Sequence, residues 1–138
     1  MNVETFIDHS SPKAKEETKQ LVMSSVLHAA DISTSLRDFD VSQIWADYLF
    51  EEFFNQGDVE KAQSLEVSFL CDRETTEIAA GQAGFISFVV LPVFKLLARL
   101  SPDVTNVQVA SGEKNILKWK AKAQAIKDAQ TAENEEKQ

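Results

Sequence analysis

Apolar residues recur at spacings of three and four along most of the chain, which is the period of an α-helix. From Lys15 to Asp31, a charged opening is followed by a face of apolar and small residues, namely Leu21, Val22, Ser25, Val26 and Ala29. This pattern predicts an amphipathic helix. Only 4 glycines and 3 prolines interrupt the sequence, so the fold class we expect is all-α, a helical bundle.

A second helix is predicted to begin near the capping candidates Asp38, Asp40 and Ser42 and to end at Gly57. Its apolar residues lie on one broad stripe, formed by Val41, Trp45, Leu49 and Phe53 and widened by Ile44, Tyr48 and Phe54. A stripe of this width is typical of a helix that packs against other helices.

The most apolar stretch is predicted to start at Asp72, a candidate N-cap, and to continue past Pro92. It is apolar nearly all round, so we expect a central helix that others enclose. Pro92 should kink this helix, because its ring nitrogen cannot donate to the Phe88 carbonyl. A last helix should begin at the Ser101-Pro102-Asp103 triplet, with Gly112 as a candidate break in it.

The length and the changes in composition suggest one domain with two flanking segments. A chain of 138 residues fits one ordinary domain and is too short for two. We expect an N-terminal extension over 1–14, a helical domain over 15–120, and a polar tail over 121–138 that is helical or disordered. The sequence contains no internal repeat.

Charge and cysteine content narrow the function classes. Fourteen Lys and Arg against 22 Asp and Glu leave a net charge of -8, which disfavours binding to nucleic acid. The single cysteine, Cys71, and two histidines, His9 and His28, exclude an internal disulfide and a structural zinc site. The start shows no secretory signal, and the uncharged stretch from Ile78 to Phe94 is shorter than the about 20 residues of a membrane span. We therefore expect no membrane span and a cytoplasmic location, or a peripheral one at a membrane surface.

Two local patterns could carry chemistry. His28 and Asp31 are three residues apart at the end of the first predicted helix, a spacing that suits a helix-end hydrogen bond as well as a metal or catalytic site. Gln82 is a lone amide in an apolar helix, and Phe85 lies on the same face. The pair could be ordinary core, or an amide that recognises a ligand beside an aromatic wall.

Longer motifs resemble a known family. The segments are LVMSSVLHAADIS, IWADYLFEEFFNQGDVEK and FLCDRETTEIAAGQAGFISFVVLPVF, followed by Asn115 and Trp119 in an N-x-x-x-W pattern. In this order and spacing they resemble the catalytic domain of class I 3',5'-cyclic nucleotide phosphodiesterases, over roughly Gln20 to Trp119. The resemblance implies three helical subdomains, of which this chain would hold the last, so that 15–120 would be a partial catalytic domain.

The resemblance also implies roles for single residues. Asp31 matches a ligand of the tightly held metal, usually Zn²⁺, in a two-metal site whose second ion is usually Mg²⁺. Gln82 matches the glutamine that pairs with the purine edge, and Phe85 matches the phenylalanine that stacks on that purine. Leu49 would lie against the purine on the side opposite Phe85. Further positions implied at the purine pocket or its edge are Trp45, Phe53 and Leu70.

Two departures from the family pattern affect the expected activity. The His-Asn-x-x-His and His-Asp motifs, with the general acid histidine, are absent, since Met1 lies only about thirty residues before Asp31. Neither His9 nor His28 stands in a matching context, so we expect no activity from this chain alone unless a second polypeptide supplies ligands. Thr34 and Ser35 replace an Asn-Pro pair whose asparagine contacts adenine, which leaves the preference between cyclic AMP and cyclic GMP open.

Two functional hypotheses follow. The first is a phosphodiesterase of signal transduction that hydrolyses cyclic AMP, cyclic GMP or both to the 5'-monophosphate at a two-metal site, present here as a fragment. The second is a noncatalytic phosphodiesterase-like helical module for partner binding or weak nucleotide binding. In either case the many aromatic residues suit a larger assembly, so we expect self-association or packing against a missing N-terminal part of the domain.

Overall fold

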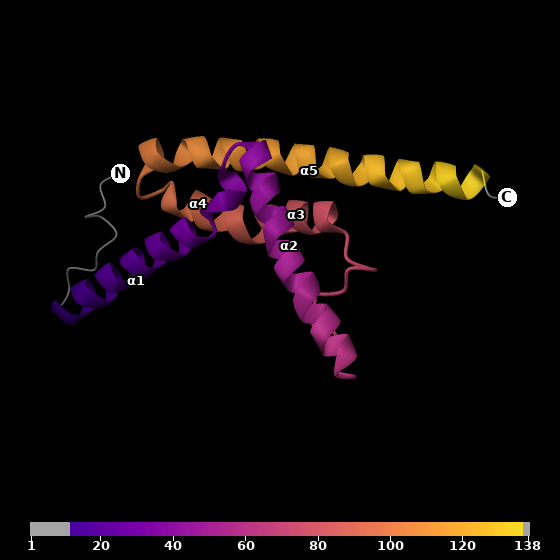
Figure 1. The fold of residues 1–138 in the computed structure, drawn as a ribbon. Helices are drawn as coiled ribbons and strands as arrows, with labels where there is room; N and C mark the ends of the chain where they lie inside the picture. The colour runs from indigo at the N-terminus through magenta and orange to yellow at the C-terminus, as the bar shows by residue number, and fades with distance from the viewer. Residues whose placement is uncertain (1–11, 137–138) are drawn as a thin grey trace.

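The protein is all-helical over residues 12–136, the part that this computed structural model describes, and no strand occurs there. Its elements are α1 (Pro12–Asp31), the 3₁₀ turn η2 (Ser33–Leu36), α2 (Phe39–Ala62), α3 (Ile78–Phe85), the π-helical turn η3 (Ile86–Val90), α4 (Leu91–Leu97) and α5 (Pro102–Glu136). In Figure 1, α3 and α4 run in one line below the long α5, while α1 and α2 project away from this pair. The predicted all-α fold is confirmed.

The core lies where α5 covers the α3, η3 and α4 segment. Ile86, Val90 and Trp119 have no exposed surface at all. Smaller residues complete the contact on the same segment and allow the helices to approach closely, among them Ala79 and Ala83. The most apolar stretch of the sequence is therefore the centre of the fold, as its composition predicts.

The central stretch begins later than predicted and is irregular before its proline. Asp72 is not its N-cap: α3 starts at Ile78, and the Asp72 carboxylate instead accepts the Glu74 N–H at 3.0 Å in the preceding turn. Directly before Pro92 lies η3, in which the Leu91 N–H donates to the Ile86 carbonyl five residues back. A wider turn at this place fits a proline that has no N–H for a regular α-helical bond.

Both glycines that were expected to end or break a helix lie inside one. α2 continues through Gly57 to Ala62, and α5 continues through Gly112. A Cβ at residue 57 would lie 1.9 Å from the Cys71 carbonyl oxygen, and one at residue 112 would lie 2.5 Å from Leu36 Cδ2. These glycines permit close packing, which outweighs their cost of about 1 kcal/mol inside a helix.

The buried face of α2 differs from the stripe of large apolar residues. The residues of α2 that are buried are Ser42, Ala46, Phe50 and Gly57. Trp45 on the predicted stripe is 56% exposed, because small residues let η2 and α3 pack closely against the neighbouring face. The large side chains are left to flank a cavity described below.

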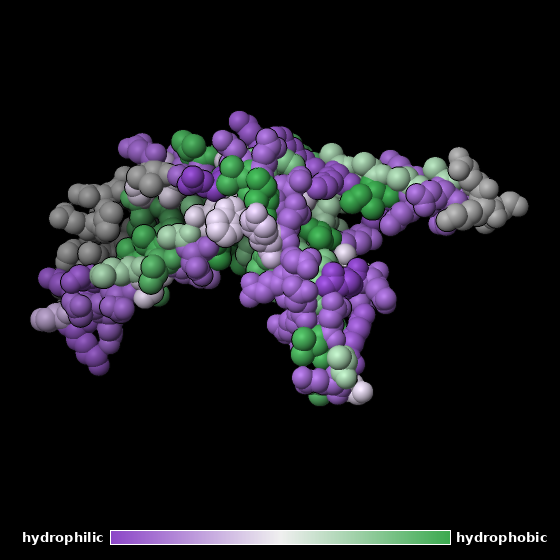
Figure 2. Space-filling view, viewed as in Figure 1, coloured by the Kyte–Doolittle hydropathy of each residue, from purple (hydrophilic) through white to green (hydrophobic). Residues whose placement is uncertain are grey.

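α1 makes few contacts with the rest of the protein. Its only buried side chain within Pro12–Asp31 is Ala29, whereas Leu21, Met23 and Leu27 are exposed, Leu27 by 73%. Figure 2 shows apolar side chains gathered between α1 and the neighbouring part of the molecule. The predicted amphipathic helix forms, but most of its apolar face is not covered in this structure.

An ionic cluster joins the end of α2 to the loop before α3. The Arg73 guanidinium donates to Asp58 Oδ2 from Nη2 at 2.6 Å and from Nε at 3.0 Å, and Lys61 donates to Asp72 at 2.8 Å. These hydrogen bonds hold the pKa of Asp58 and of Asp72 below its usual range. The cluster holds the loop before α3 against the end of α2, close to the contact between Gly57 and Cys71.

One stretch, Ile78–Leu97, is long and apolar enough to cross a membrane by length and composition. Part of it is buried as the core of this fold, and core helices in general pass the same test. The stretch is weak support for a membrane span.

Substitution of Gly57 by Ala should destabilise the protein by about 1–3 kcal/mol, because a Cβ would overlap the Cys71 carbonyl and force the loop away from α2. Gly84→Ala is the matched control: nothing lies within 4 Å of its Cβ position, so it should stabilise the helix by about 0.5–1 kcal/mol. Urea unfolding of both variants measures the difference. Equal stability of the two variants would contradict the close packing at Gly57.

The ionic cluster should stabilise the fold only where its carboxylates are charged. The pKa of Asp58 is lowered in the folded state, so its contribution is present above the unfolded pKa of about 3.9 and is lost as the pH falls through the folded pKa. Asp58→Asn should therefore reduce the free energy of unfolding near neutral pH, and the difference from the wild type should shrink below about pH 4. Urea titrations across this range measure it, with Asp47→Asn, outside the cluster, as the control. A difference that grows as the pH falls would contradict the sign.

Candidate functional site

Six of the eight predicted site residues line one cavity of about 410 Å³. They come from three parts of the chain, the end of α1 with η2, the middle of α2, and α3, and they are Asp31, Thr34, Trp45, Leu49, Gln82 and Phe85. The volume lies within the about 300–1,000 Å³ that is typical of small-molecule sites. The fold thus brings together residues that are up to fifty-four positions apart in the sequence.

α3 contributes one polar and one aromatic side chain to the cavity. Gln82 and Phe85 are three residues apart, so both side chains face the cavity. Gln82 is only 7% exposed, and within residues 12–136 its side-chain amide makes no hydrogen bond, whereas Phe85 is 37% exposed. The amide therefore keeps a donor and an acceptor that can pair with water or with a ligand.

The opposite wall comes from α2. Trp45 and Leu49 are four residues apart and therefore lie one above the other on the helix. Trp45 also contacts Tyr48 edge to face, with ring centroids 6.5 Å apart. The cavity is consequently a slot between apolar side chains of α2 and the Gln82 and Phe85 pair of α3.

Phe53 and Leu70 lie elsewhere. Phe53 is one helical turn beyond Leu49 and packs edge to face on Phe50, with centroids 5.8 Å apart. Leu70 sits in the loop before α3 in a left-handed backbone conformation, with φ 67°. Neither lines this cavity.

Four further residues line the cavity that were not among the predicted site residues. Ser35, Ser42 and Ala46 are buried, and Ile32 is partly buried. Ser42 looked like a helix cap, and the others are small or apolar residues that occur in any core. Only their position in the tertiary structure shows that they belong to the site.

Asp31 borders a second, shallower hollow of about 470 Å³, lined by Ser24, Leu27, His28 and Asp31. A catalytic zinc site takes three protein ligands, and a two-metal site takes more. Among the side chains that the structure describes, no three His, Cys, Asp or Glu residues lie together as a metal-binding group. The donors of residues 12–136 therefore do not fit a zinc and magnesium pair by themselves.

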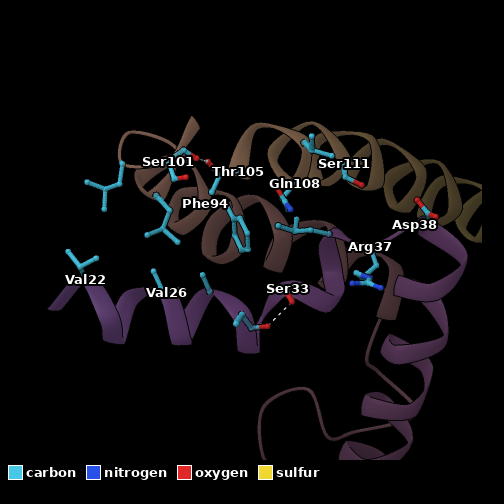
Figure 3. A pocket seen from close by; sticks show the side chains of 16 residues that line it. Val22, Val26, Ser33, Arg37, Asp38, Phe94, Ser101, Thr105, Gln108 and Ser111 are labelled. Carbon is cyan, nitrogen blue, oxygen red and sulfur yellow. Dashed lines mark hydrogen bonds between the residues drawn. The ribbon is translucent and has the colours of Figure 1, made fainter. Parts of the chain in front are cut away.

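A larger hollow, about 780 Å³, lies between α1, α4 and α5 (Figure 3). Val22 and Val26 of α1 face Phe94 of α4 across it, and Gln108 of α5 points toward it. The Gln108 Oε1 atom is buried and has no hydrogen-bond partner in the described part of the chain. This hollow separates α1 from α4 and α5, because α1 packs only weakly against them.

Comparisons with known proteins identify the family to which this chain belongs. Residues 2–110 match the family model described as 3'5'-cyclic nucleotide phosphodiesterase. The chain is 42% identical over 95 residues to the mouse dual specificity calcium/calmodulin-dependent 3',5'-cyclic nucleotide phosphodiesterase 1C, covering 69% of this chain and 13% of that protein. It is 47% identical over 79 residues to the bovine phosphodiesterase 1B of the same description, covering 57% of this chain and 15% of that protein.

A solved structure is also similar. The structure of LmjPDEB1 in complex with IBMX superposes with a TM-score of 0.71 and 30% sequence identity, over 92% of this chain and 36% of that one. The chain thus spans a minor part of the proteins that it matches, both in sequence and in structure. Because the family model covers most of its length, the chain belongs to the 3'5'-cyclic nucleotide phosphodiesterase family.

Proposed function

We propose that this chain supplies the purine-binding side of a cyclic nucleotide phosphodiesterase site. The observation that carries the proposal is the cavity in which the unpaired amide of Gln82 lies beside Phe85 and opposite Leu49. A carboxamide donates and accepts at once, as the hydrogen-bonding edge of a purine requires. The slot between Phe85 and Leu49 suits a flat ring that stacks on the aromatic face.

The two polar residues at the η2 end have separate roles in this proposal. Thr34, which stands where the family often has an asparagine, would contribute to the choice between cyclic AMP and cyclic GMP. Asp31 would give one carboxylate to a metal centre. Since residues 12–136 hold no complete ligand group, the other ligands of that centre would have to come from outside them. Hydrolysis with Zn²⁺ and Mg²⁺ would accordingly require those ligands as well.

A noncatalytic module is the second candidate function, and one observation favours it. The purine cavity lies wholly within the described residues, whereas the metal donors there are incomplete. A chain of this kind could bind a cyclic nucleotide without turning it over. The two candidates share the Gln82 cavity and differ only in whether a metal centre is completed beside Asp31.

The uncovered face of α1 belongs to the same proposal. Leu21, Met23 and Leu27 are exposed, and the matched structure contains a further part of chain that has no counterpart here. Exposed apolar patches of this kind mark interfaces. We propose that this face packs against the remaining part of a phosphodiesterase catalytic domain, and that it drives self-association when that part is missing.

Isothermal titration of the 138-residue chain with cyclic AMP and with cyclic GMP tests nucleotide binding. Gln82→Ala should weaken binding about tenfold or more, because the purine edge loses its hydrogen-bond partner. Gln124→Ala is the matched control, since Gln124 is exposed on α5 and bonds only to Asp128 within the described residues. Binding that is absent in the wild type, or unaffected by Gln82→Ala, would refute the proposed purine site.

The same samples decide between the two candidate functions when Mg²⁺ and Zn²⁺ are added. With its incomplete donor set, the chain should bind nucleotide without hydrolysing it. Turnover that disappears in Asp31→Ala would instead show that this chain completes a metal centre.

Sedimentation velocity tests the apolar face of α1. The wild-type chain should self-associate as its concentration rises, and Leu21→Glu combined with Leu27→Glu should shift the distribution toward monomer, because charge opposes burial of the face. Leu117→Glu on α5, where Leu117 is 68% exposed, is the matched control. A wild-type chain that stays monomeric at all concentrations would argue against the proposed interface.

A further inference from the structure

We propose that Asn115 is a positioning residue for nucleotide selectivity. From α5 it holds the η2 turn, which carries Thr34, and thereby fixes the wall of the purine cavity. The inference rests on the proposed function and deepens it, because Asn115 does not itself line the cavity. Its effect would pass through the backbone of a segment nearly eighty residues away in the sequence.

The η2 turn has few hydrogen bonds of its own. It is a four-residue 3₁₀ turn whose closing bond, from the Arg37 N–H to the Thr34 carbonyl, is 3.2 Å long. Short 3₁₀ segments have poor bond geometry and depend on their surroundings. Thr34 and Ser35 of this turn line the cavity, so any displacement of η2 changes the shape of the site.

Asn115 attaches this turn to α5. Its Nδ2 group donates to the Ser35 carbonyl at 2.9 Å and to the Arg37 carbonyl at 2.8 Å. The residue is 3% exposed, so both of its amide hydrogens are engaged in hydrogen bonds with which water does not compete. The further bond to the Ser35 carbonyl, from Ser42 Oγ, is 3.4 Å long and therefore weak. Ser33 Oγ ties the start of the turn to the Ala30 carbonyl of α1 at 2.6 Å, and Asn115 ties the rest of the turn to α5.

Apolar contacts set the register of α5 so that this amide meets the turn. One turn before Asn115, Gly112 allows α5 to approach Leu36 of η2. One turn after it, Trp119 packs on Phe39 at the start of α2, with ring centroids 5.0 Å apart. α5 therefore contacts the end of the turn at Leu36 and the start of α2 at Phe39, and the asparagine adds directional bonds to Ser35 and Arg37.

The consequence concerns the distance between the two walls of the cavity. Gln82 and Phe85 belong to α3, which α5 holds through a separate and extensive contact. Thr34 belongs to η2, which depends on Asn115. Loss of the tether would move Thr34 relative to Gln82 without removing either side chain, and this would change how the cavity discriminates between purines that differ at their edge.

A double-mutant cycle tests the role in selectivity. Thr34→Asn should change the ratio of cyclic AMP to cyclic GMP affinity by at least about threefold in the wild-type chain, since an amide replaces a hydroxyl at the cavity wall. In the Asn115→Asp background, where a carboxylate opposes two carbonyls, that change should be lost. Asn106→Asp, an exposed position on the same helix, should leave it intact. An equal effect of Thr34→Asn in all three backgrounds would overturn the proposal.

Hydrogen exchange gives a readout that does not need a nucleotide. In Asn115→Asp, amides of residues 33–38 should exchange at least about tenfold faster while α3 is unaffected, because only the η2 tether is lost. Asn115→Ser, which keeps one donor, should give an intermediate rate and serves if the aspartate variant does not fold. Unchanged exchange at η2 would overturn the tether. A wild-type chain that binds neither nucleotide would overturn the proposed function and the selectivity role, whereas faster exchange would still establish Asn115 as the residue that holds η2.

Discussion

The close approach of α5 to the central helical stretch is the constraint on which the rest of the structure depends. Gly112 makes it possible, because any side chain there would overlap Leu36 and Leu91. Trp119 completes it with a side chain that has no exposed surface. The same contact covers η2, so the packing of one helix pair also decides where the cavity wall stands. Interiors packed at this density tolerate no added atoms without displacement of a neighbour.

The two halves of the candidate site differ in how much of them this chain contains. The cavity that we propose for the purine is built from residues 31–85, which form consecutive elements of one fold. The proposed metal end has Asp31 and a neighbouring His28, and no complete ligand group within the described residues. The exposed apolar residues of α1 lie in the same region as this incomplete end. The chain covers 36% of the matched structure, so most of that structure has no counterpart among these residues.

Periodicity identified the helices well, but local signals misplaced several of their limits. Gly57 and Gly112 resemble helix ends because glycine is the commonest residue after one. Here each lies against a distant backbone or side chain, and such long-range contacts leave no local trace. Asp72 is a good cap by composition, yet its carboxylate is bound to Lys61 and to the turn before α3. The start of α5 at Pro102 was predictable, because proline at a first helical position depends only on its neighbours.

What the sequence alone determined is the all-α class, the apolar centre around Ile86 and the family, since periodicity and motif order are properties of neighbouring residues. It also placed Gln82 and Phe85 on one face, because three residues make nearly one helical turn. Only the tertiary structure decided that Trp45 and Leu49 face them while Phe53 does not, and that Asn115 holds η2. Those facts depend on the relative placement of helices, which close contacts at small residues set and which no local pattern encodes.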